Sequence, residues 1–535
     1  MKKVSFDFII VGGGTAGSVT ASKLVKSGAK VLIIEEGGAN KNPFLQMPAA
    51  WITMLSGSPY LKFHKSIPQP QLNGRQHDIA QAKILGGGSS VNAMVYMRGK
   101  PSDYEKWKES TKDPSWEWGS IIKNYIQIEN NQRLNNKFHG IDGPLTVSDP
   151  AYVAKGSDLY IKSMQELGLP YNTDFNNGEQ YGVGLMQYTI GDGIRSDCVK
   201  AFLNPLMHNP NLRIVLKTIV TKIIIENHKA IGVEIYSQGK VSSVYANNEI
   251  ILTAGSIISP KLLMLSGIGD EEELKKHNIK LINKLPGVGK NLQDHHEIPF
   301  VTKAKGGYGY FRQNTGWRMI KNGIQYLMFR SGPVTSCGVD CCAFLNPFDL
   351  SDAKDPPIKL YCVQIMYTDR DTKNIKLDHG VTLTPCLMNP KARGEIKLKS
   401  SDPMELPLIN PNFLSNEKDI KMLLAGVKLA RQVIHTRPLS DIIINEILPG
   451  SQITSDNELI NYCKKAVKTN WHPVGTCKMG DDLDKMSVLN SKLQVFGVEN
   501  LRVFDVSMMP NIIGANTNAP AMAIADKATD MLLNN

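Results

Sequence analysis

The start of the chain constrains the fold more than any other part of the sequence. Residues Phe6–Val11 are apolar except for Asp7, which is typical of a strand covered on both faces of a parallel sheet. A Gly-x-Gly-x-x-Gly turn follows, and residues 18–26 and 30–34 continue as an expected helix and a second buried strand. This order of strand, turn, helix and strand predicts an α/β domain with a parallel sheet.

The same unit predicts a bound dinucleotide. Gly12, Gly14 and Gly17 let the backbone approach a pyrophosphate, and the helix start offers unpaired N–H groups and a positive dipole end. Glu35, directly after the second strand, is placed to accept the hydroxyls of an adenosine ribose. The unit therefore predicts a Rossmann-like site. By itself it does not separate FAD from NAD, because both carry the same adenosine diphosphate half.

Length and charge narrow the class of protein. A chain of 535 residues is too long for one compact core, so two domains are expected. Hydrophobic and charged residues make up 42% and 21% of the chain, which is typical of a folded globular protein. The net charge is +11, but the lysines are scattered along the sequence, so we expect no nucleic-acid partner.

The sequence has neither a signal-peptide pattern before its first strand nor an apolar run of roughly 18 residues or more. We therefore expect a cytoplasmic protein with at most peripheral membrane contact, and the oligomeric state stays open. The 8 cysteines are irregularly spaced, so we expect no metal site. For Cys337, Cys341 and Cys342 a redox or metal role stays open beside the default of small buried side chains.

Two internal segments are rich in glycine or in helix-capping signals. Residues 82–92 hold three consecutive glycines and two serines, whose amides could lie against a phosphate or a flat ring. Residues 255–269 follow an expected buried strand at 249–254. There, Pro260 near a helix start and Gly267 past its end fit normal capping.

A fourth segment, residues 471–480, points to catalysis. Trp471 is large enough to wall a pocket, and Pro473 stiffens the backbone beside His472. A histidine suits a general base because its unperturbed pKa of ~6.5 lies near the operating pH. A histidine packed in the core is the alternative interpretation.

These segments, together with residues 285–295, resemble the glucose-methanol-choline (GMC) family of FAD-dependent oxidoreductases over essentially the whole chain. The sequence looks closest to choline dehydrogenase and to related primary and aryl alcohol oxidoreductases. The resemblance implies FAD rather than NAD. Some members attach FAD through a histidine at a position that is Val91 here, which implies a non-covalent flavin. The implied cofactor contacts are Gly12, Gly14, Thr15, Ala16, Gly17, Glu35, Leu85, Gly87, Gly88, Asn92, Met94, Val95, Val220, Trp471, Asp505, Asn516 and Thr517.

The resemblance also implies alcohol oxidation. It places the catalytic base at His472 and the second active-site residue at Asn516, with Asn518 as the near competitor. Neutral His472 would accept the hydroxyl proton as hydride passes to flavin N5, and Asn516 would orient the oxygen; one positioned base contributes ~10² to 10⁴ in rate. The electrons would then pass to O2 or to a quinone-type acceptor, and the sequence does not decide between them.

The cofactor motifs occur at both ends and in the middle of the chain, so we expect a discontinuous FAD-binding domain. Its expected parts are residues 1–150, 191–300 and 465–535, and residues 151–190 and 301–464 form the substrate-binding domain. Residues 381–388 and 394–399 predict an antiparallel hairpin in that domain. The resemblance implies a second domain built on an antiparallel sheet over the flavin, with helices behind it.

The alcohol stays open among choline, aliphatic and aryl compounds. A quaternary ammonium group would need an aromatic cage and a carboxylate, and Trp51, Phe344, Tyr361 and Tyr367 are the candidates for the cage. Two other functions also stay open. One is a light-driven fatty-acid decarboxylase on the same fold, and the other is a non-catalytic FAD-binding scaffold. His472 argues against both.

Overall fold

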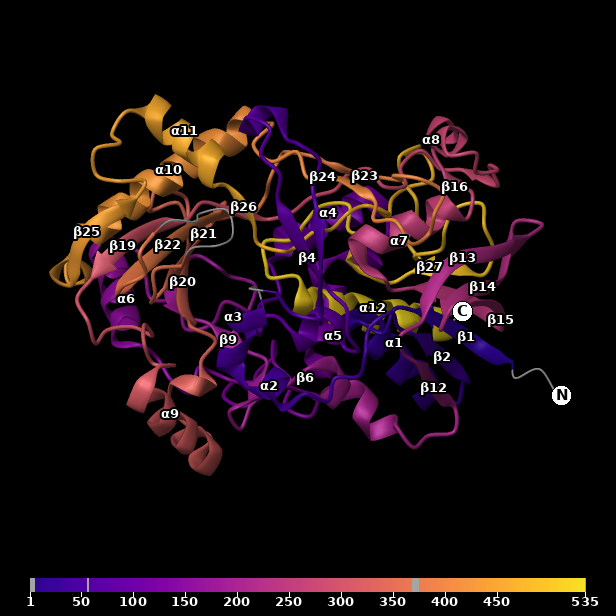
Figure 1. Cartoon of the computed structure of the whole chain (residues 1–535), viewed down its shortest axis with the longest axis horizontal. Coiled ribbons are helices and arrows are strands. Elements are labelled where there is room, and N and C mark those ends of the chain that lie inside the picture. The colour runs from indigo at the N-terminus through magenta and orange to yellow at the C-terminus, as the bar shows by residue number, and fades with distance from the viewer. Residues whose placement is uncertain (1–4, 55–56, 368–374, 535) are drawn as a thin grey trace.

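Two sheets lie side by side along the long axis of the molecule (Figure 1). The computed structural model describes residues 5–54, 57–367 and 375–534. The first motif belongs to a seven-stranded sheet of order β12-β2-β1-β15-β14-β13, with β27 beside β15. Its strands are β1 (Phe6–Val11), β2 (Val31–Ile34), β12 (Leu212–Val215), β13 (Ile219–Glu226), β14 (Lys229–Ser237), β15 (Lys240–Leu252) and β27 (Leu501–Val503).

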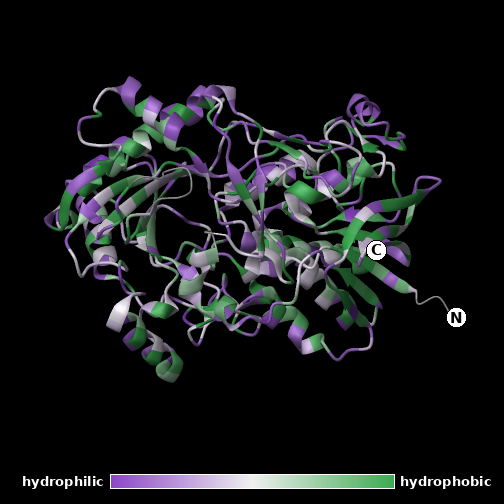
Figure 2. Cartoon of the chain, viewed as in Figure 1, coloured by the Kyte–Doolittle hydropathy of each residue, from purple (hydrophilic) through white to green (hydrophobic). Residues whose placement is uncertain are grey.

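The centre of this first sheet is parallel and apolar. β1 pairs in parallel with both β2 and β15, and β2 pairs in parallel with β12. Ile9, Ile10 and Ile33 are fully buried, as the near-continuous apolar runs predicted. Figure 2 shows these strands as a mainly hydrophobic cluster near the N-terminus. The Rossmann-like part of the predicted fold is confirmed.

Helices α1 (Thr15–Lys26) and α12 (Asn518–Leu533) pack against each other beside this sheet. Lys23 of α1 forms a 2.8 Å ion pair with Asp526 of α12, so the two ends of the sequence are tied together. α12 also packs on α5 (Trp118–Ile128). The first and last segments of the sequence therefore form one structural unit.

Pro260 lies inside α7 (Gly255–Leu265), not near its start as the capping pattern suggested. A proline within a helix frees the carbonyl four residues earlier, here that of Ser256. The Thr476 hydroxyl donates to this carbonyl at 2.6 Å and replaces the missing N–H. The helix can therefore continue through Pro260 because a side chain from the C-terminal segment completes it.

The second sheet has eight strands in the order β25-β19-β22-β21-β20-β8, with β18 attached at β22 and β26 attached at β18. They are β8 (Gly182–Leu185), β18 (His296–Glu297), β19 (Phe300–Ala304), β20 (Val339–Leu345), β21 (Ile358–Val363), β22 (Gly380–Leu387), β25 (Ile443–Leu448) and β26 (Lys468–Thr469). Their pairings are antiparallel. Helices α6 (Lys155–Glu166) and α10 (Glu417–Ile434) pack on the sheet, and α11 (Asp456–Ala466) packs on α10. This architecture confirms the predicted second domain.

The predicted hairpin of residues 381–388 and 394–399 is wrong. β22 is paired on its two edges by β19 and β21, so no edge is left for the next segment. Residues 395–397 form β23 (Glu395–Lys397), which pairs with β24 (Leu408–Asn410) instead. Ile396 also donates its N–H to the carbonyl of Gly289 at 2.6 Å, which holds this segment near the first sheet.

The expected domain limits at residues 300 and 465 do not follow the sheets. β18 at 296–297 and β26 at 468–469 belong to the second sheet, although both lie inside the ranges expected for the FAD-binding domain. The division into 1–150, 191–300 and 465–535 against 151–190 and 301–464 stays a prediction.

The other elements are shorter or lie at the periphery. The helices are α2 (Pro43–Gln46), α3 (Trp51–Met54), α4 (Pro101–Thr111), α8 (Glu271–Lys276) and α9 (Gly316–Phe329). The strands are β3 (Leu61–Lys65), β4 (Asp78–Ala82), β5 (Val95–Tyr96), β6 (Glu129–Asn131), β7 (Leu145–Val147), β9 (Gln187–Tyr188), β10 (Ile190–Gly191), β11 (Ile194–Arg195), β16 (Ile268–Gly269) and β17 (Asn283–Lys284).

Candidate active site

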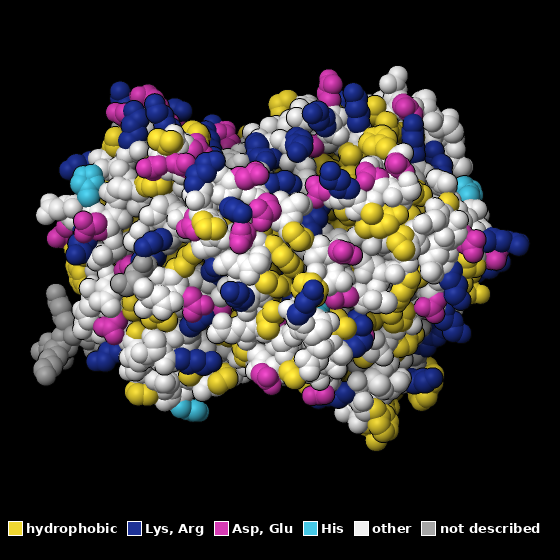
Figure 3. Space-filling model, turned by 180° about the vertical axis from the view of Figure 1, so that it is seen from behind, with side chains coloured by type: hydrophobic (Ala, Val, Ile, Leu, Met, Phe, Trp, Pro, Cys, Tyr) yellow, Lys and Arg dark blue, Asp and Glu magenta, His cyan; other side chains and the backbone are white. Residues whose placement is uncertain are grey.

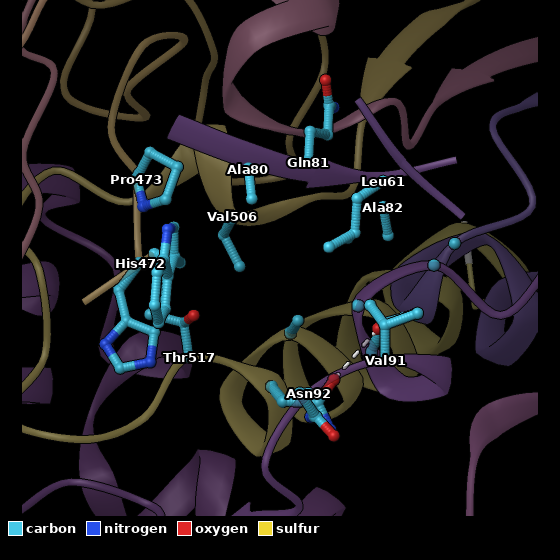
Figure 4. Close-up of a pocket in the computed structure, with 18 of the residues that line it drawn as sticks. Leu61, Ala80, Gln81, Ala82, Val91, Asn92, His472, Pro473, Val506 and Thr517 are labelled. Carbon is cyan, nitrogen blue, oxygen red and sulfur yellow. Dashed lines mark hydrogen bonds between the residues drawn. The ribbon is translucent and has the colours of Figure 1, made fainter. Parts of the chain in front are cut away.

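One cavity is lined by residues from both sheets. Gly12 and Val220 reach it from the first sheet and its turns, and Glu297, Tyr361 and Thr384 reach it from the second. Figure 4 shows His472 and Pro473 on one side of this pocket and Val91 and Asn92 on another, with Ala80, Gln81 and Ala82 of β4 along a third. The cavity therefore joins the dinucleotide motif to the C-terminal histidine.

Glycines allow two backbone turns to meet at one end of the cavity. A Cβ on Gly87 would lie 2.6 Å from the Cα of Gly14, and a Cβ on Gly12 would lie 2.8 Å from the carbonyl oxygen of Thr253. Gly87 and Gly12 also have φ angles of +54° and +104°, which glycine tolerates best. A Cβ on Gly88 would have no heavy atom of the described residues within 4 Å, so the backbone there is open to the cavity.

Two helix N-termini face the same cavity. Gly14 precedes α1 and Thr517 precedes α12, and no side chain in the described part of the chain caps either helix. Thr15 and Asn518 both line the cavity, and the Thr15 hydroxyl donates to Asn518 Oδ1 at 3.0 Å. The uncapped N–H groups and the two positive dipole ends suit an anionic ligand such as the pyrophosphate of FAD.

Glu35 is held between two glycine turns. Its carboxylate accepts the N–H of Gly13 at 2.8 Å and the N–H of Gly37 at 2.7 Å. Burial raises the pKa of Glu35 to about 7, while these two N–H groups oppose that rise. Each oxygen keeps a second lone pair, so the carboxylate can still accept a ribose hydroxyl. Glu36, which sequence reasoning did not single out, also lines the cavity and pairs with Lys62 at 2.9 Å.

His472 and Asn516 meet at the other end of the cavity. Asn516 Nδ2 lies 3.4 Å from His472 Nε2. Asn518 is engaged with Thr15 instead. Of the two asparagines proposed from the sequence, Asn516 is therefore the one beside the histidine.

The hydrogen bonds around Asn516 fix the orientation of its amide. Lys359 Nζ donates to Asn516 Oδ1 at 2.9 Å, and the Tyr361 hydroxyl donates to the same oxygen at 3.2 Å. Because Oδ1 is taken by two donors, Nδ2 is the atom that faces His472. An amide nitrogen can only donate, so His472 Nε2 must be the acceptor and carry no proton.

The tautomer of His472 follows from the other side of the ring. His472 Nδ1 lies 3.0 Å from His295 Nδ1, and His295 Nε2 lies 3.2 Å from the carbonyl oxygen of Met388. A carbonyl only accepts, so His295 carries its proton on Nε2 and accepts at Nδ1. His472 therefore donates from Nδ1, which agrees with an unprotonated Nε2 directed at the cavity.

Burial and charge keep His472 neutral. Burial lowers the pKa of His472 to about 3, and the Lys359 ammonium adds to this effect. The backbone is fixed as well, because the His472 N–H donates to Asp294 Oδ1 at 2.9 Å and Asp294 also accepts the Thr469 hydroxyl. Burial raises the pKa of Asp294 to about 7.

Lys359, His295 and Asp294 did not emerge as candidates from the sequence. Asp294 and His295 end the Leu285–His295 segment, which contributed to the family resemblance. The signal for Lys359 was a single charged residue inside the apolar strand Ile358–Val363, where it is fully buried. Buried lysines are rare unless they are paired or functional, so this pattern could have identified Lys359 as a candidate site residue.

The sequence-predicted residues gather at this cavity with few exceptions. Of the residues that the structure describes, Gly17, Leu85 and Phe344 do not line the cavity. Gly17 packs against Gly12, because a Cβ there would lie 2.1 Å from the Gly12 carbonyl oxygen. Those that line it are Gly12, Gly14, Thr15, Ala16, Glu35, Gly87, Gly88, Asn92, Met94, Val95, Val220, Trp471, His472, Asp505, Asn516 and Thr517, with Trp51, Tyr361 and Tyr367 of the proposed cage.

The cysteines are buried and unpaired. Cys337 lines the cavity, and its carbonyl oxygen accepts the Trp51 indole N–H at 2.7 Å. Burial raises the pKa of the Cys337 thiol to about 12 and that of Cys342 to about 11, so both stay protonated at neutral pH. Within the described residues, no group of three or more His, Cys, Asp or Glu side chains could hold a metal ion.

Comparison with known proteins agrees with this architecture. Models of the GMC oxidoreductase family match residues 6–297 and 390–525. An alcohol dehydrogenase (acceptor) of Pseudomonas putida is 37% identical, over 99% of this chain and 96% of its own length. An oxygen-dependent choline dehydrogenase of Rhizobium rhizogenes is 34% identical, over 98% of this chain and 95% of its own length.

Solved structures give the same result. Pyridoxine 4-oxidase from Mesorbium loti superposes with a TM-score of 0.91 at 27% identity, over 99% of this chain and 100% of its own. The cofactor of the family is FAD, and the glycine turns, Glu35 and the two uncapped helices provide groups that fit it. The chain belongs to the GMC oxidoreductases and is an FAD-dependent oxidoreductase that acts on the CH–OH group of alcohols.

Proposed function

We propose that His472 is the base and Asn516 the orienting residue in the oxidation of a primary alcohol. The observation that carries this proposal is the hydrogen-bond chain that leaves His472 Nε2 without a proton at the cavity surface. A base of this kind must accept a proton at a defined atom. The hydrogen bonds that run from Lys359 through Asn516, His472 and His295 to the Met388 carbonyl define that atom as His472 Nε2.

The substrate hydroxyl would lie between the two side chains. It would donate to His472 Nε2 and accept from Asn516 Nδ2, replacing the 3.4 Å contact between them. FAD, when bound, supplies the hydride acceptor. As the carbinol carbon loses its hydride, His472 takes the hydroxyl proton, and the alcohol leaves as the aldehyde. The two electrons pass on to an acceptor outside the chain.

Lys359 would stabilise the negative charge that develops on the substrate oxygen. Its ammonium reaches Asn516 Oδ1 at 2.9 Å and polarises the amide that donates to that oxygen. Burial lowers the pKa of Lys359 to about 8, so the group stays mainly charged at neutral pH. Since Lys359 acts through Asn516, it is a positioning residue.

O2 or a quinone-type compound is the proposed electron acceptor. The relatives include both an "acceptor" alcohol dehydrogenase and oxygen-dependent enzymes, so either class suits the family. The flavin is proposed to be non-covalent because Val91, which lines the cavity, offers no nucleophile. The decarboxylase and scaffold alternatives are not favoured, because the named relatives oxidise alcohols.

Anaerobic reduction of the bound flavin by a panel of primary alcohols tests this function. We expect His472→Gln to lower the rate constant for reduction by about 10² to 10⁴ while the protein keeps its flavin. His277→Gln is the matched control, since His277 directly follows α8, lies 3.6 Å from Glu273 and does not line the cavity. A His472→Gln enzyme that is reduced as fast as the unaltered protein would refute the assignment.

A further inference from the structure

Helix α9 turns its apolar side away from the protein. Asn322 and Tyr326, one helical turn apart, face inward, and Tyr326 is 2% exposed. Trp317 is 73% exposed and Leu327 is 71% exposed. At 3.6 residues per turn five exposed apolar side chains form one stripe opposite the buried pair. Its members are Trp317, Ile320, Ile324, Leu327 and Met328, whereas the exposed Met319 and Phe329 lie on either side of the buried pair.

The segment that carries this stripe is basic. Residues 306–339 contain no Asp or Glu. Their cations are Arg312, Arg318, Lys321 and Arg330, and the last three lie on α9 or directly after it. Figure 1 shows α9 projecting from the body of the molecule below the second sheet, and in Figure 3 the corresponding corner, seen from behind, carries hydrophobic and basic side chains. Elsewhere on that face Lys and Arg are interspersed with Asp and Glu.

α9 is also connected to the cavity wall. It contacts the short helix η7 (Pro333–Thr335). The chain then runs directly into Cys337, Gly338 and Val339, which line the cavity. A surface that α9 contacts would therefore lie close to one side of the active site.

We propose that α9 docks on the surface of a membrane that contains anionic lipids. The apolar stripe would enter the boundary between headgroups and acyl chains, and Arg318, Lys321 and Arg330 would contact lipid phosphates. This combination of Trp and Leu on one face with Lys and Arg beside it is typical of helices that lie in the interface. Of the helices in the described ranges, none is long and apolar enough to cross the bilayer, so the contact is peripheral.

A second copy of the chain fits the stripe less well. A stable protein interface buries roughly 800 Å² on each partner, which one face of a 14-residue helix hardly supplies. A two-fold contact would also bring identical basic surfaces together, which costs free energy. Anionic lipid complements both the apolar stripe and the cations around it.

Flotation of the flavin-loaded protein with vesicles tests the proposal. We expect it to float with vesicles of 30% phosphatidylglycerol in phosphatidylcholine, and binding to fall with added salt because lipid attraction is screened. Ile320→Gln, Ile324→Gln and Leu327→Gln together should abolish flotation. The matched control changes Phe44, Phe348 and Leu483 to Gln, which are 66%, 65% and 85% exposed outside α9.

Two results would overturn membrane docking. One is a protein that does not float with the anionic vesicles at low salt, or a triple α9 variant that floats as well as the unaltered protein. The other is a dimer in sedimentation experiments that the triple variant abolishes, which would assign the stripe to a second copy. Ile320, Ile324 and Leu327 do not line the cavity, so flavin reduction by alcohols in solution reports separately on the proposed function.

A separate observation concerns the charge of the substrate. The cavity contains the parts of a receptor for an ammonium group, namely the Glu297 carboxylate and the rings of Tyr367 and Trp471. The chain's own Lys468 already occupies this arrangement. Its Nζ lies 2.5 Å from Glu297 Oε1, 4.6 Å from the Tyr367 ring centre and 5.2 Å from the Trp471 ring centre. Lys468 and Glu297 stand opposite each other on β26 and β18.

We infer that Lys468 excludes quaternary ammonium alcohols and that the enzyme takes uncharged alcohols. This inference rests on the proposed function and names its substrate class. An incoming cation would have to displace Lys468 or lie beside it, and like charges in a buried site repel strongly. An uncharged alcohol of the same shape meets no such barrier.

Choline and 3,3-dimethylbutan-1-ol form a matched pair, because they differ mainly by nitrogen against carbon. We expect the unaltered enzyme to favour the uncharged alcohol by at least about 100-fold in binding and in flavin reduction. Lys468→Met should narrow this ratio by at least tenfold. Lys527→Met, which removes a lysine that lies 5.8 Å from the Trp116 ring and donates to Ser120, is the control and should leave the ratio unchanged.

Binding measured by calorimetry tests the lysine by itself, whereas reduction also tests the proposed function. Equal binding of the two compounds by the unaltered enzyme would overturn the inference. An unchanged ratio in a Lys468→Met protein that keeps its flavin would do so too. Normal discrimination in binding without any reduction would instead count against the catalytic roles of His472 and Asn516.

Discussion

The two ends of the cavity are built from different groups, one mainly from backbone and the other from side chains. The dinucleotide end is made mainly of backbone: glycine turns, uncapped helix N-termini and a carboxylate held by two N–H groups. The alcohol end is made of side chains, with Lys359, Asn516, His472 and His295 in one hydrogen-bonded chain. The backbone end depends on shape, and the side-chain end depends on charge and proton position.

The largest effect should come from the side-chain end. Asn516→Leu removes the proposed donor to the substrate oxygen, and loss of one such donor costs roughly 10² to 10³ in rate. Asn518→Leu should cost much less, because Asn518 accepts from Thr15 and does not reach His472. Single-turnover reduction of the flavin measures both. A larger loss in Asn518→Leu than in Asn516→Leu would exchange the roles of the two asparagines.

A substitution at the backbone end should weaken the binding of FAD instead. Gly87→Ala places a Cβ 2.6 Å from Gly14 Cα at a φ of +54°, which forces the two turns apart. With strain of about 1 to 3 kcal/mol, FAD should bind roughly 5 to 150 times more weakly. Gly239→Ala is the control: it has a φ of +78°, and no described heavy atom lies within 4 Å of its Cβ. Titration of the two apoproteins with FAD measures both affinities, and equal affinities would contradict this expectation.

Replacing Lys359 tests whether this residue acts through its charge or only through the space that it fills. Lys359→Met should slow flavin reduction by about tenfold, since Asn516 loses a charged donor. The pH profile adds a second readout. His472 has a pKa lowered to about 3, so kcat/KM should not fall through its protonation until the pH approaches that value. Removing the Lys359 cation makes protonation of His472 easier, so the acid limb should move to higher pH. An unshifted acid limb would mean that Lys359 only fills space.

The smallest effect concerns stability in acid. Burial lowers the pKa of His472 to about 3 and that of His64 to about 4, whereas both titrate near 6.5 in an unfolded chain. Below pH 6.5 the unfolded state binds protons that the folded state does not. Each of these histidines should therefore lower the free energy of unfolding by about 1 kcal/mol per pH unit as pH drops from 6.5 toward 4, while Glu35 and Asp294, whose pKa values are raised to about 7, act in the opposite direction. As the pH falls over this range, thermal unfolding should show that His472→Gln gains stability relative to the unaltered protein.

The sequence predicted the backbone end better than the side-chain end for a physical reason. Gly12, Gly14 and Glu35 lie in one local segment whose spacing is set by one strand, one turn and one helix. Lys359 and Asn516 are 157 positions apart and His295 and His472 are 177 apart, so their contacts depend on the packing of two sheets. The hairpin was predicted wrongly for the same reason, because local alternation does not reveal that β19 and β21 already pair with β22.

Neutron diffraction from a deuterated crystal of the FAD-loaded enzyme at pH 7 measures the protonation of His472 directly. We expect deuterium on His472 Nδ1 and on His295 Nε2, with none on His472 Nε2. Deuterium on His472 Nε2 would contradict the role of His472 as the base, because that atom could not then accept the proton of an alcohol.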